Sequence, residues 1–389
     1  MIDHYFHKFH IGTYYLQLNA RTERHVKELS ACGIDFVIGM ENDKETLDLF
    51  KQYHVGAIVS GVVPGWFGGR GENAGQMATL NPKERYLEGM TAFGDHPAII
   101  GIDVGDEPSG LDFPYYAEIL KLVREKLPNK IPYLNLYPSY GISSDSDKMQ
   151  IDQELGKTTY REYLAEYCEN IDLPYLSFDH YLYASNRERF FSDLFEAASA
   201  CKRYHKTLWV VLQVNSREKD VFIREDQLCD QAFSALTFGV SAITWACYSG
   251  GWWYNHVLDA EGNRTQQYEK LKRVNEKLQN LTEAYIDYRW IDTEFLDQES
   301  GTSFGSFGSI QSSQKALLGK FDRADGSKAI YYYPMDCEDA DDSLLQFTVD
   351  DHKSVYCYTV DGPKEIFSDK NDVYTARLRY MEACFIVIK

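Results

Sequence analysis

Short apolar runs alternate with amphipathic stretches along residues 11–248. The apolar runs are six to eight residues long and rich in β-branched and aromatic residues, a pattern typical of buried strands. Eight strands are predicted, at 11–18, 34–40, 55–60, 99–104, 131–137, 175–180, 207–214 and 242–247. Helices are predicted between them, at 21–32, 44–53, 82–93, 114–126, 159–170, 187–204 and 225–238. Regular alternation of eight strands with helices predicts an α/β fold, the (β/α)8 TIM barrel.

A doubly wound open sheet is the alternative for the same alternation. That fold usually has a Gly-rich phosphate-binding turn directly after its first strand. Here the first strand ends in Gln17-Leu18-Asn19-Ala20, which contains no glycine. The pattern therefore favours the barrel.

The pattern changes after residue 265. Apolar side chains recur every three or four residues over 265–285, which predicts an amphipathic helix that packs against the outside of the barrel. Residues 300–309 are rich in Gly and Ser and are predicted to form a linker or an exposed loop.

The C-terminal part contains short β-rich runs with turn residues between them. Strands are predicted at 316–321, 329–333, 344–349, 354–359, 373–380 and 384–388. Consecutive strands without helices between them predict a small antiparallel β-sandwich of roughly 75 residues. We therefore expect two domains, a barrel with its packing helix over 1–310 and a β-sandwich over 311–389.

Composition narrows the class of partner. The net charge of −19 argues against nucleic acid, whose phosphates need a basic surface, and against anionic membranes. The chain is rich in aromatic residues, with 29 Tyr, 21 Phe and 6 Trp, which is a mild indication of sugar binding as well as of a large core. A neutral carbohydrate substrate fits both features, and the oligomeric state is left open.

The N-terminal residues and the cysteines indicate the cellular compartment of the protein. The first residues have no basic and apolar signal-peptide pattern, and the eight Cys include no C-x-x-C pair. The cysteines lie mostly in apolar surroundings, as expected for buried free thiols in a reducing compartment. We expect a cytoplasmic protein, although a secreted chain that has lost its leader would show the same features.

The fourth predicted strand leads into Asp106-Glu107-Pro108. In a parallel barrel, the carboxyl ends of the strands carry the catalytic groups. Glu107 is therefore predicted to be a general acid, with Asp106 positioning it or binding a sugar hydroxyl. Asp103 is expected to point into the barrel, where a carboxylate needs a partner. The alternative is that the two carboxylates only favour the start of the next helix.

The sixth predicted strand ends in Asp179-His180-Tyr181. Asp179 is predicted to be the second catalytic carboxylate, with His180 and Tyr181 orienting it or binding sugar hydroxyls. The alternative is a capped strand end with a buried, hydrogen-bonded histidine.

Other side chains at predicted strand ends complete an aromatic-lined pocket. Gln213 ends the seventh strand and can bind hydroxyls, but it cannot act as a nucleophile or a base. Each of these residues could alternatively belong to the core. Besides Gln213, the expected substrate contacts are Glu41, Trp66, Asn135, Tyr137 and Trp245.

Several other kinds of site are not expected. The chain has no Walker A motif, no His-Glu-x-x-His helix, no Cys/His cluster with zinc spacing and no Gly-x-Ser-x-Gly elbow in the barrel region. We therefore expect neither a metal nor a cofactor.

The motifs at these strand ends resemble those of the (β/α)8 retaining glycoside hydrolases of clan A, especially the β-galactosidase-like and uncharacterised gut-bacterial members. Asp106-Glu107-Pro108 is similar to the Asn-Glu-Pro of that clan, which implies Glu107 as acid/base. His180 and Tyr181 are similar to the His/Tyr pair on the sixth strand of that clan. Trp245 is similar to the Trp on its eighth strand that forms the floor of the sugar site. The resemblance covers nearly the whole chain, including the helix from Thr265 and the sandwich.

Two positions depart from that family. Gln213 stands where the clan has its nucleophilic Glu, and Asp106 stands where it has Asn. The departures leave three mechanisms open: a retaining pair, an inverting pair with Asp179 as base, or assistance by an acetamido group of the substrate, as in hexosaminidases. A catalytically inactive barrel that only binds carbohydrate is the alternative to all three.

Overall fold

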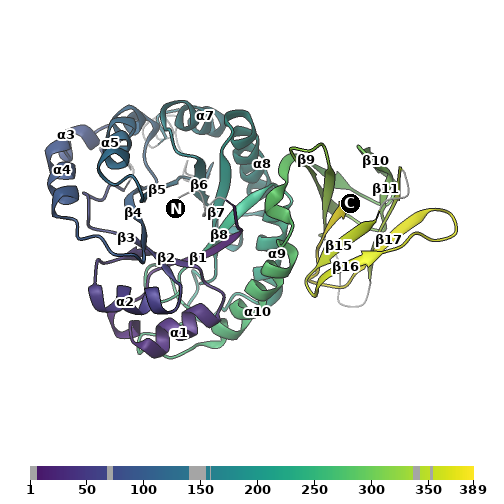
Figure 1. The fold of residues 1–389 in the computed structure, drawn as a ribbon, viewed down its shortest axis with the longest axis horizontal. Helices are drawn as coiled ribbons and strands as arrows, with labels where there is room; N and C mark the ends of the chain where they lie inside the picture. The colour runs from purple at the N-terminus through teal and green to yellow at the C-terminus, as the bar shows by residue number, and fades with distance from the viewer. Residues whose placement is uncertain (1–6, 68–72, 140–154, 158, 336–341, 351–353) are drawn as a thin grey trace. The chain divides into compact units, whose positions relative to one another are not determined.

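The computed structural model describes residues 7–67, 73–139, 155–157, 159–335, 342–350 and 354–389. Its first part is a closed barrel of eight strands in chain order, with helices outside the ring (Figure 1). The strands are β1 (His10–Tyr14), β2 (Phe36–Met40), β3 (Gly56–Val59), β4 (Ile99–Asp106), β5 (Ile131–Leu136), β6 (Tyr175–Asp179), β7 (Thr207–Gln213) and β8 (Val240–Ala246). Each predicted strand is present, and the predicted TIM barrel is confirmed.

Helices connect these strands, as the alternating pattern predicted. The described α-helices are α1 (Glu23–Ala31), α2 (Lys44–Gln52), α3 (Met77–Leu80), α4 (Lys83–Ala92), α5 (Phe113–Lys126), α7 (Tyr160–Asn170), α8 (Arg187–Tyr204), α9 (Glu225–Leu236) and α10 (Gln266–Leu281). Short 3-10 turns also occur, among them η4 (Gly110–Asp112) and η6 (Leu182–Ala184).

Side-chain caps explain where two of the helices begin. At α7, the hydroxyl of Thr159 accepts from the backbone of Glu162, whose carboxylate accepts from the backbone of Thr159. At α8, the Asn186 side chain accepts from the Arg189 N–H at 2.9 Å. These caps end the preceding loops and set where each helix starts.

The pairing of strands brings the chemistry-bearing residues together. Asp106 of β4 is paired with Asn135 of β5, and Asn135 is paired with Ser177 of β6. Gly101 permits the close approach of β4 and β5, because a Cβ there would lie 2.5 Å from the carbonyl oxygen of Ile131. The register thus lines up polar side chains from three neighbouring strands at one level of the barrel.

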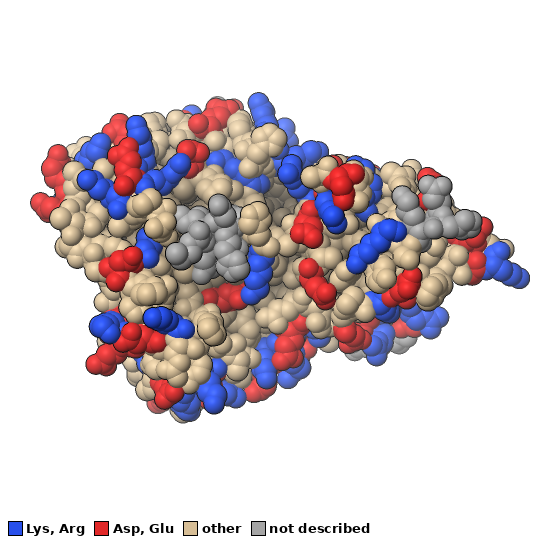
Figure 2. Space-filling model, in the orientation of Figure 1, with Lys and Arg blue, Asp and Glu red and all other residues tan. Residues whose placement is uncertain are grey.

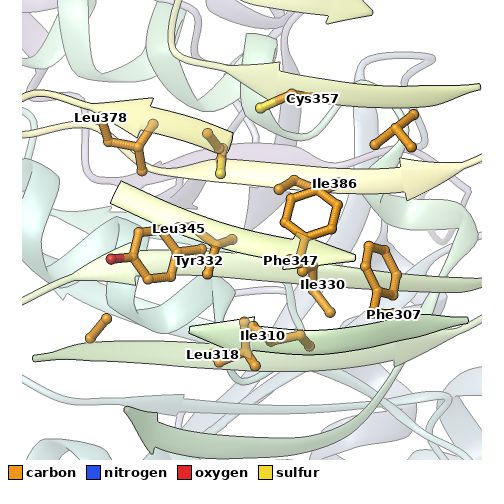
Figure 3. Close-up of a cluster of buried hydrophobic side chains, with 14 of the residues drawn as sticks. Phe307, Ile310, Leu318, Ile330, Tyr332, Leu345, Phe347, Cys357, Leu378 and Ile386 are labelled. Atoms are coloured by element: carbon orange, nitrogen blue, oxygen red, sulfur yellow. The ribbon is translucent and has the colours of Figure 1, made fainter. Parts of the chain in front are cut away.

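The C-terminal strands form two antiparallel sheets. One has the order β10-β11-β14-β17 and the other β16-β15-β18-β13-β12-β9. Buried residues from both sheets, including Phe307, Leu318 and Ile386, pack into one apolar core (Figure 3). The predicted β-sandwich is confirmed. Its strands are β9 (Arg289–Leu296), β10 (Gly301–Phe304), β11 (Phe307–Ser312), β12 (Ala316–Asp322), β13 (Lys328–Pro334), β14 (Ser343–Val349), β15 (Val355–Thr359), β16 (Gly362–Ile366), β17 (Val373–Leu378) and β18 (Cys384–Ile388).

The prediction of a linker or exposed loop at 300–309 was wrong, because this segment forms the hairpin of β10 and β11. Gly305 adopts a φ of 55°, which suits the tight turn between the two strands. Phe307 and Ile310 are fully buried in the sandwich core. The alternating apolar side chains therefore outweigh the Gly/Ser composition that suggested a loop.

Residue contacts divide the chain into two compact units. One comprises residues 10–223 and 242–269, and the other comprises residues 7–9, 224–241 and 270–389. The boundary predicted at residue 310 lies inside β11. Lys and Arg side chains are interspersed with Asp and Glu on the face shown in Figure 2.

Candidate active site

The end of β4 is held by backbone bonds on both sides. The Asp106 N–H donates to the carbonyl of Trp66 at 2.9 Å, and the Glu107 N–H donates to the carbonyl of Asn135 at 2.8 Å. Glu107 has a φ of 42°, which non-glycine residues rarely adopt. A side chain at Gly105 would collide with the hydroxyl of Tyr116, 2.1 Å from its Cβ. These constraints direct the two adjacent carboxyl groups away from the regular alternation of a strand.

Asn135 bridges two carboxyl groups. Its side-chain nitrogen donates to Asp106 at 3.2 Å and to Asp179 at 2.9 Å. Its oxygen accepts from the Ser177 hydroxyl at 2.9 Å, which sets the orientation of the amide. The bridge uses both N–H groups of the amide, so Asn135 positions the carboxyl groups of neighbouring strands.

A chain of hydroxyl groups extends this network across the barrel. The Tyr133 hydroxyl lies 3.2 Å from that of Ser177 and 3.0 Å from that of Tyr14. All three residues are buried. Polar groups in such a chain hold one another in a single arrangement, which makes the floor of the site rigid.

Three Asp carboxyl groups share a region largely withdrawn from water. Burial raises the pKa of Asp103 to about 6, although the Ser60 hydroxyl donates to it at 2.9 Å. Burial, and then the charge of Asp103, raise the pKa of Asp106. Burial, and then the charge of Asp106, raise the pKa of Asp179. Close like charges cannot all ionise near neutral pH, so this cluster retains protons.

Glu107 is hydrogen-bonded to Asp179. This bond and the one from Asn135 lower the pKa of Asp179 and so partly offset its burial. A partner that lowers the pKa of a carboxyl group stabilises its ionised form by donating to it. The two carboxyl groups therefore share a hydrogen bond, while burial keeps the pKa of Asp179 raised overall. Beyond Glu107, the Tyr163 hydroxyl donates to the carbonyl of Pro108 at 2.7 Å and anchors the segment.

The raised pKa of Asp106 has a consequence for stability. A carboxyl group whose pKa is higher in the folded than in the unfolded chain stabilises the fold below the unfolded value, 3.8, and this contribution is lost as the pH rises through the folded value. We expect Asp106→Asn, which cannot ionise, to be more stable than the wild type by about 1–2 kcal/mol at pH 8, with the gain vanishing near pH 4.

Urea unfolding at the two pH values measures this difference. Glu45→Gln, which removes an exposed carboxylate of α2, is the matched control and should show no such pH dependence. A variant that is no more stable than the wild type at pH 8 would argue against a costly buried charge at Asp106.

His180 and Tyr181 follow β6 and face different surroundings. The Nδ1 of His180 lies 2.9 Å from the carboxylate of Asp193 in α8, and both side chains are buried. Burial lowers the pKa of His180, while Asp193 opposes that effect. Tyr181 is partly exposed, and its ring contacts Trp252 and Trp253 with centroid separations of 6.2 and 4.9 Å.

Gln213 has both ends of its side chain bonded to the main chain. Its oxygen accepts from the Tyr183 N–H at 3.1 Å, and its nitrogen donates to the carbonyl of Asn215 at 3.0 Å. Gln213 is buried, so these bonds join the segments that follow β6 and β7.

The remaining predicted substrate contacts differ in how exposed their side chains are. Tyr137 and Trp245 are buried, and the carbonyl of Trp245 accepts from the Thr13 hydroxyl at 2.8 Å. Trp66 is also buried, and its indole N–H donates to Asp112 at 3.2 Å. Glu41 is exposed and paired with Arg21.

Sequence reasoning did not single out Tyr133 and Ser177. The signal that could have found them is the alternation along the strands. Tyr133 lies two residues before Asn135, and Ser177 lies two residues before Asp179, so each pair points to the same side of its strand.

Other features of the described residues help to delimit the site. A cavity of about 1040 Å³ at the amino ends of β5 and β6 is lined by residues such as Lys121 and Asn129, away from the carboxyl cluster.

Among the described residues, no group of three or more His, Cys, Asp or Glu side chains is arranged to hold a metal ion. No helix in the described part of the chain is both long and apolar enough to span a membrane.

The comparisons with known proteins found matches among solved structures only. No protein-family model and no curated protein matches the chain. Among solved structures, a candidate α-L-fucosidase from Bacteroides thetaiotaomicron VPI-5482 is similar, with a TM-score of 0.51 and 12% identity over 69% of this chain and 94% of that chain. A cycloisomaltooligosaccharide glucanotransferase from Paenibacillus sp. matches 98% of this chain and 85% of that chain, with a TM-score of 0.57 and 8% identity.

These similarities concern the fold. They confirm the barrel architecture that the resemblance to clan A glycoside hydrolases implied. The match to the glucanotransferase extends over nearly the whole chain, and so includes the C-terminal strands as well as the barrel.

Proposed function

We propose that the chain is a glycoside hydrolase that cleaves O-glycosidic bonds with Glu107 as general acid. The observation that carries the proposal is the hydrogen bond between Glu107 and Asp179 beside the buried Asp carboxyl groups. A general acid must hold its proton at the working pH and lie where the substrate can reach it. Glu107 is partly exposed at the carboxyl end of β4, the end at which TIM-barrel enzymes carry out their chemistry.

Two comparisons support the substrate class. Two similar structures with TM-scores above 0.5 are a candidate α-L-fucosidase and a cycloisomaltooligosaccharide glucanotransferase complexed with cycloisomaltoheptaose, and both names refer to sugars. The aromatic side chains at the same end, among them Tyr181 and Trp252, offer apolar surfaces that match the faces of sugar rings.

Asp179 acts as a stabiliser of the acid in this proposal. Inverting enzymes separate their two carboxyl groups by about 6.5–9.5 Å and retaining enzymes by about 5–5.5 Å, because a sugar lies between them. Asp179 is instead hydrogen-bonded to Glu107, so no sugar fits between the two groups. The two groups share one proton in this proposal, and Glu107 delivers it to the leaving oxygen.

The other predicted residues divide into two roles. Asp106, Tyr181 and Glu41 are partly or fully exposed, and we propose that they contact the substrate. The buried residues shape the floor and walls of the site and hold its loops in place. They are Trp66, Asn135, Tyr137, His180, Gln213 and Trp245.

Gln213 favours a second mechanism within the same class. The β7 end carries this amide, whose two ends are bonded to the main chain, and an amide supplies no nucleophile. A 2-acetamido group of the substrate could take that role, with Asp106 orienting the acetamido group and Glu107 protonating the leaving oxygen. This route predicts a substrate of the hexosaminide type.

A panel of nitrophenyl glycosides tests the function and separates the two mechanisms. The panel pairs each hexoside with its 2-acetamido counterpart, and proton NMR follows the first-formed anomer. We expect turnover of at least one glycoside, and substrate assistance requires the acetamido compound to react at least 100-fold faster than its hydroxyl counterpart. A folded protein that binds sugars but hydrolyses no member of the panel would instead be the inactive carbohydrate-binding barrel.

A further inference from the structure

A cleft of about 820 Å³ opens at the ends of β1, β2 and β8, and its residue Tyr15 lies near enough to Asp106 for the charge of that carboxyl group to act on it. Its lining combines two aromatic rings, Tyr15 and Trp252, with the amide of Gln17 and the ion pair of Arg21 and Glu41. None of these groups takes part in the proton transfer described above. The cleft has a volume typical of small-molecule sites.

The ring of Tyr15 is held between two glycines. A Cβ on Gly39 would lie 2.4 Å from the ring, and a Cβ on Gly251 would lie 2.8 Å from it. Tyr15 itself has a φ of 62°, a conformation that residues with side chains seldom adopt. Three backbone positions thus accommodate this one ring, which gives the cleft a wall that needs no reordering when a ligand binds.

The charged pair in the cleft is also held in place. The guanidinium of Arg21 donates to Glu41 at 2.8 Å and to the carbonyl of Leu16 at 2.8 Å, and only 9% of the Arg21 side chain is exposed. The Glu41 side chain is 68% exposed. A carboxylate has about four acceptor positions, so Glu41 can accept hydroxyl groups of a ligand while it remains paired with Arg21.

Trp252 connects this cleft to the carboxyl cluster. Its ring centroid lies 5.9 Å from that of Tyr15 in the cleft and 5.6 Å from that of Tyr14. Tyr14 is linked through Tyr133 to Ser177, which orients the amide between Asp106 and Asp179. Trp252 also contacts Tyr181, with ring centroids 6.2 Å apart, so this ring borders both the cleft and a proposed substrate contact of the Glu107 site.

We propose that this cleft binds a second, neutral sugar ring, so that the enzyme prefers oligosaccharides to simple monosaccharide glycosides. The inference rests on the proposed function. A sugar ring has an apolar face, which suits Trp252 and Tyr15, and a rim of hydroxyl groups, which suits Glu41 and Gln17. The carboxylate of Glu41 and the net charge of −19 disfavour a uronic acid at this position.

Calorimetry on the full chain carrying Glu107→Gln tests this cleft without turnover. The probes are methyl glucoside, galactoside and xyloside, together with cellobiose, maltose, lactose and xylobiose. We expect the best disaccharide to bind at least tenfold more tightly than its methyl monosaccharide. Adding Gln17→Ala and Glu41→Gln, both on exposed side chains, should reduce this ratio to below about threefold, since hydrogen bonds to a charged group are lost.

The control and the assays separate failure of the cleft from failure of the enzyme. Glu45→Gln removes an exposed carboxylate of α2 that does not line the cleft, and should leave the ratio unchanged. Hydrolysis of aryl glycosides by the wild type, combined with a ratio that is near one or insensitive to the double substitution, would overturn the cleft alone. Absence of hydrolysis by the wild type of both the aryl glycosides and the four disaccharides would overturn the proposed function.

Discussion

We expect Glu107→Gln to lower kcat on glycosides with poor leaving groups by about 10²–10⁴-fold, the contribution that general acid catalysis makes. The amide keeps the size of the side chain and can still donate to Asp179, so the fold is preserved, but it cannot transfer a proton to the leaving oxygen. The measurement is kcat for alkyl and nitrophenyl glycosides of one sugar, compared between the wild type and the variant.

A comparison of leaving groups makes this experiment specific for general acid catalysis. An acidic leaving group, such as dinitrophenolate, departs without protonation, so the variant should lose less activity on it than on an alkyl glycoside. Glu45→Gln is the matched control, because it makes the same chemical change on an exposed residue of α2. A Glu107→Gln enzyme that retains wild-type activity on alkyl glycosides would refute the role of Glu107.

The barrel could be predicted from the sequence because its strands are buried. Runs such as 99–102 and 208–212 contain no polar side chain, and such runs need two covered faces. The hairpin at 300–309 was not predicted because its exposed positions are Gly and Ser, which are typical of loops. Its buried face is marked by few apolar side chains, namely Phe307, Ile310 and the partly buried Phe304. Local composition and burial conflict there, and burial determines the structure.

The candidate site could be predicted only in part, for a different reason. Asp106, Glu107 and Asp179 stand out in the sequence because carboxylates at the ends of buried strands are costly. Their mutual contacts depend on the register between β4, β5 and β6 and on the positive φ of Glu107, neither of which is visible in a single sequence. Asn135 illustrates the limit, because the sequence predicts it as a sugar contact but does not show that its amide bridges Asp106 and Asp179.

The elevated pKa values in this site also connect its stability with its chemistry. Three carboxyl groups held together in a buried region cost folding free energy when they ionise, which is the basis of the stabilisation expected for Asp106→Asn. The same crowding keeps a proton within the cluster at the pH where an acid catalyst needs one. The cost in stability and the capacity for acid catalysis therefore have one physical origin.

Asp179→Asn distinguishes a stabiliser of the acid from a catalytic base. As a stabiliser, Asp179 shares a proton with Glu107 and is negatively charged whenever Glu107 holds that proton, and a neutral amide removes this charge. We expect kcat/KM to fall about 10–100-fold, and the alkaline limb of the pH–rate profile to move to lower pH, because Glu107 then loses its proton more readily. The measurement is the pH dependence of kcat/KM for the best glycoside of the panel.

A catalytic base would behave differently in the same experiment. Loss of an inverting base should lower the rate by 10³-fold or more, leave the alkaline limb in place, and allow azide to restore activity with formation of a glycosyl azide of inverted configuration. Asp95→Asn, at an exposed aspartate paired with Lys130 at the amino end of the barrel, provides the control for removing one negative charge. Azide rescue of Asp179→Asn would overturn the stabiliser role, whereas a shifted alkaline limb without rescue is the result that the hydrogen bond between Glu107 and Asp179 predicts.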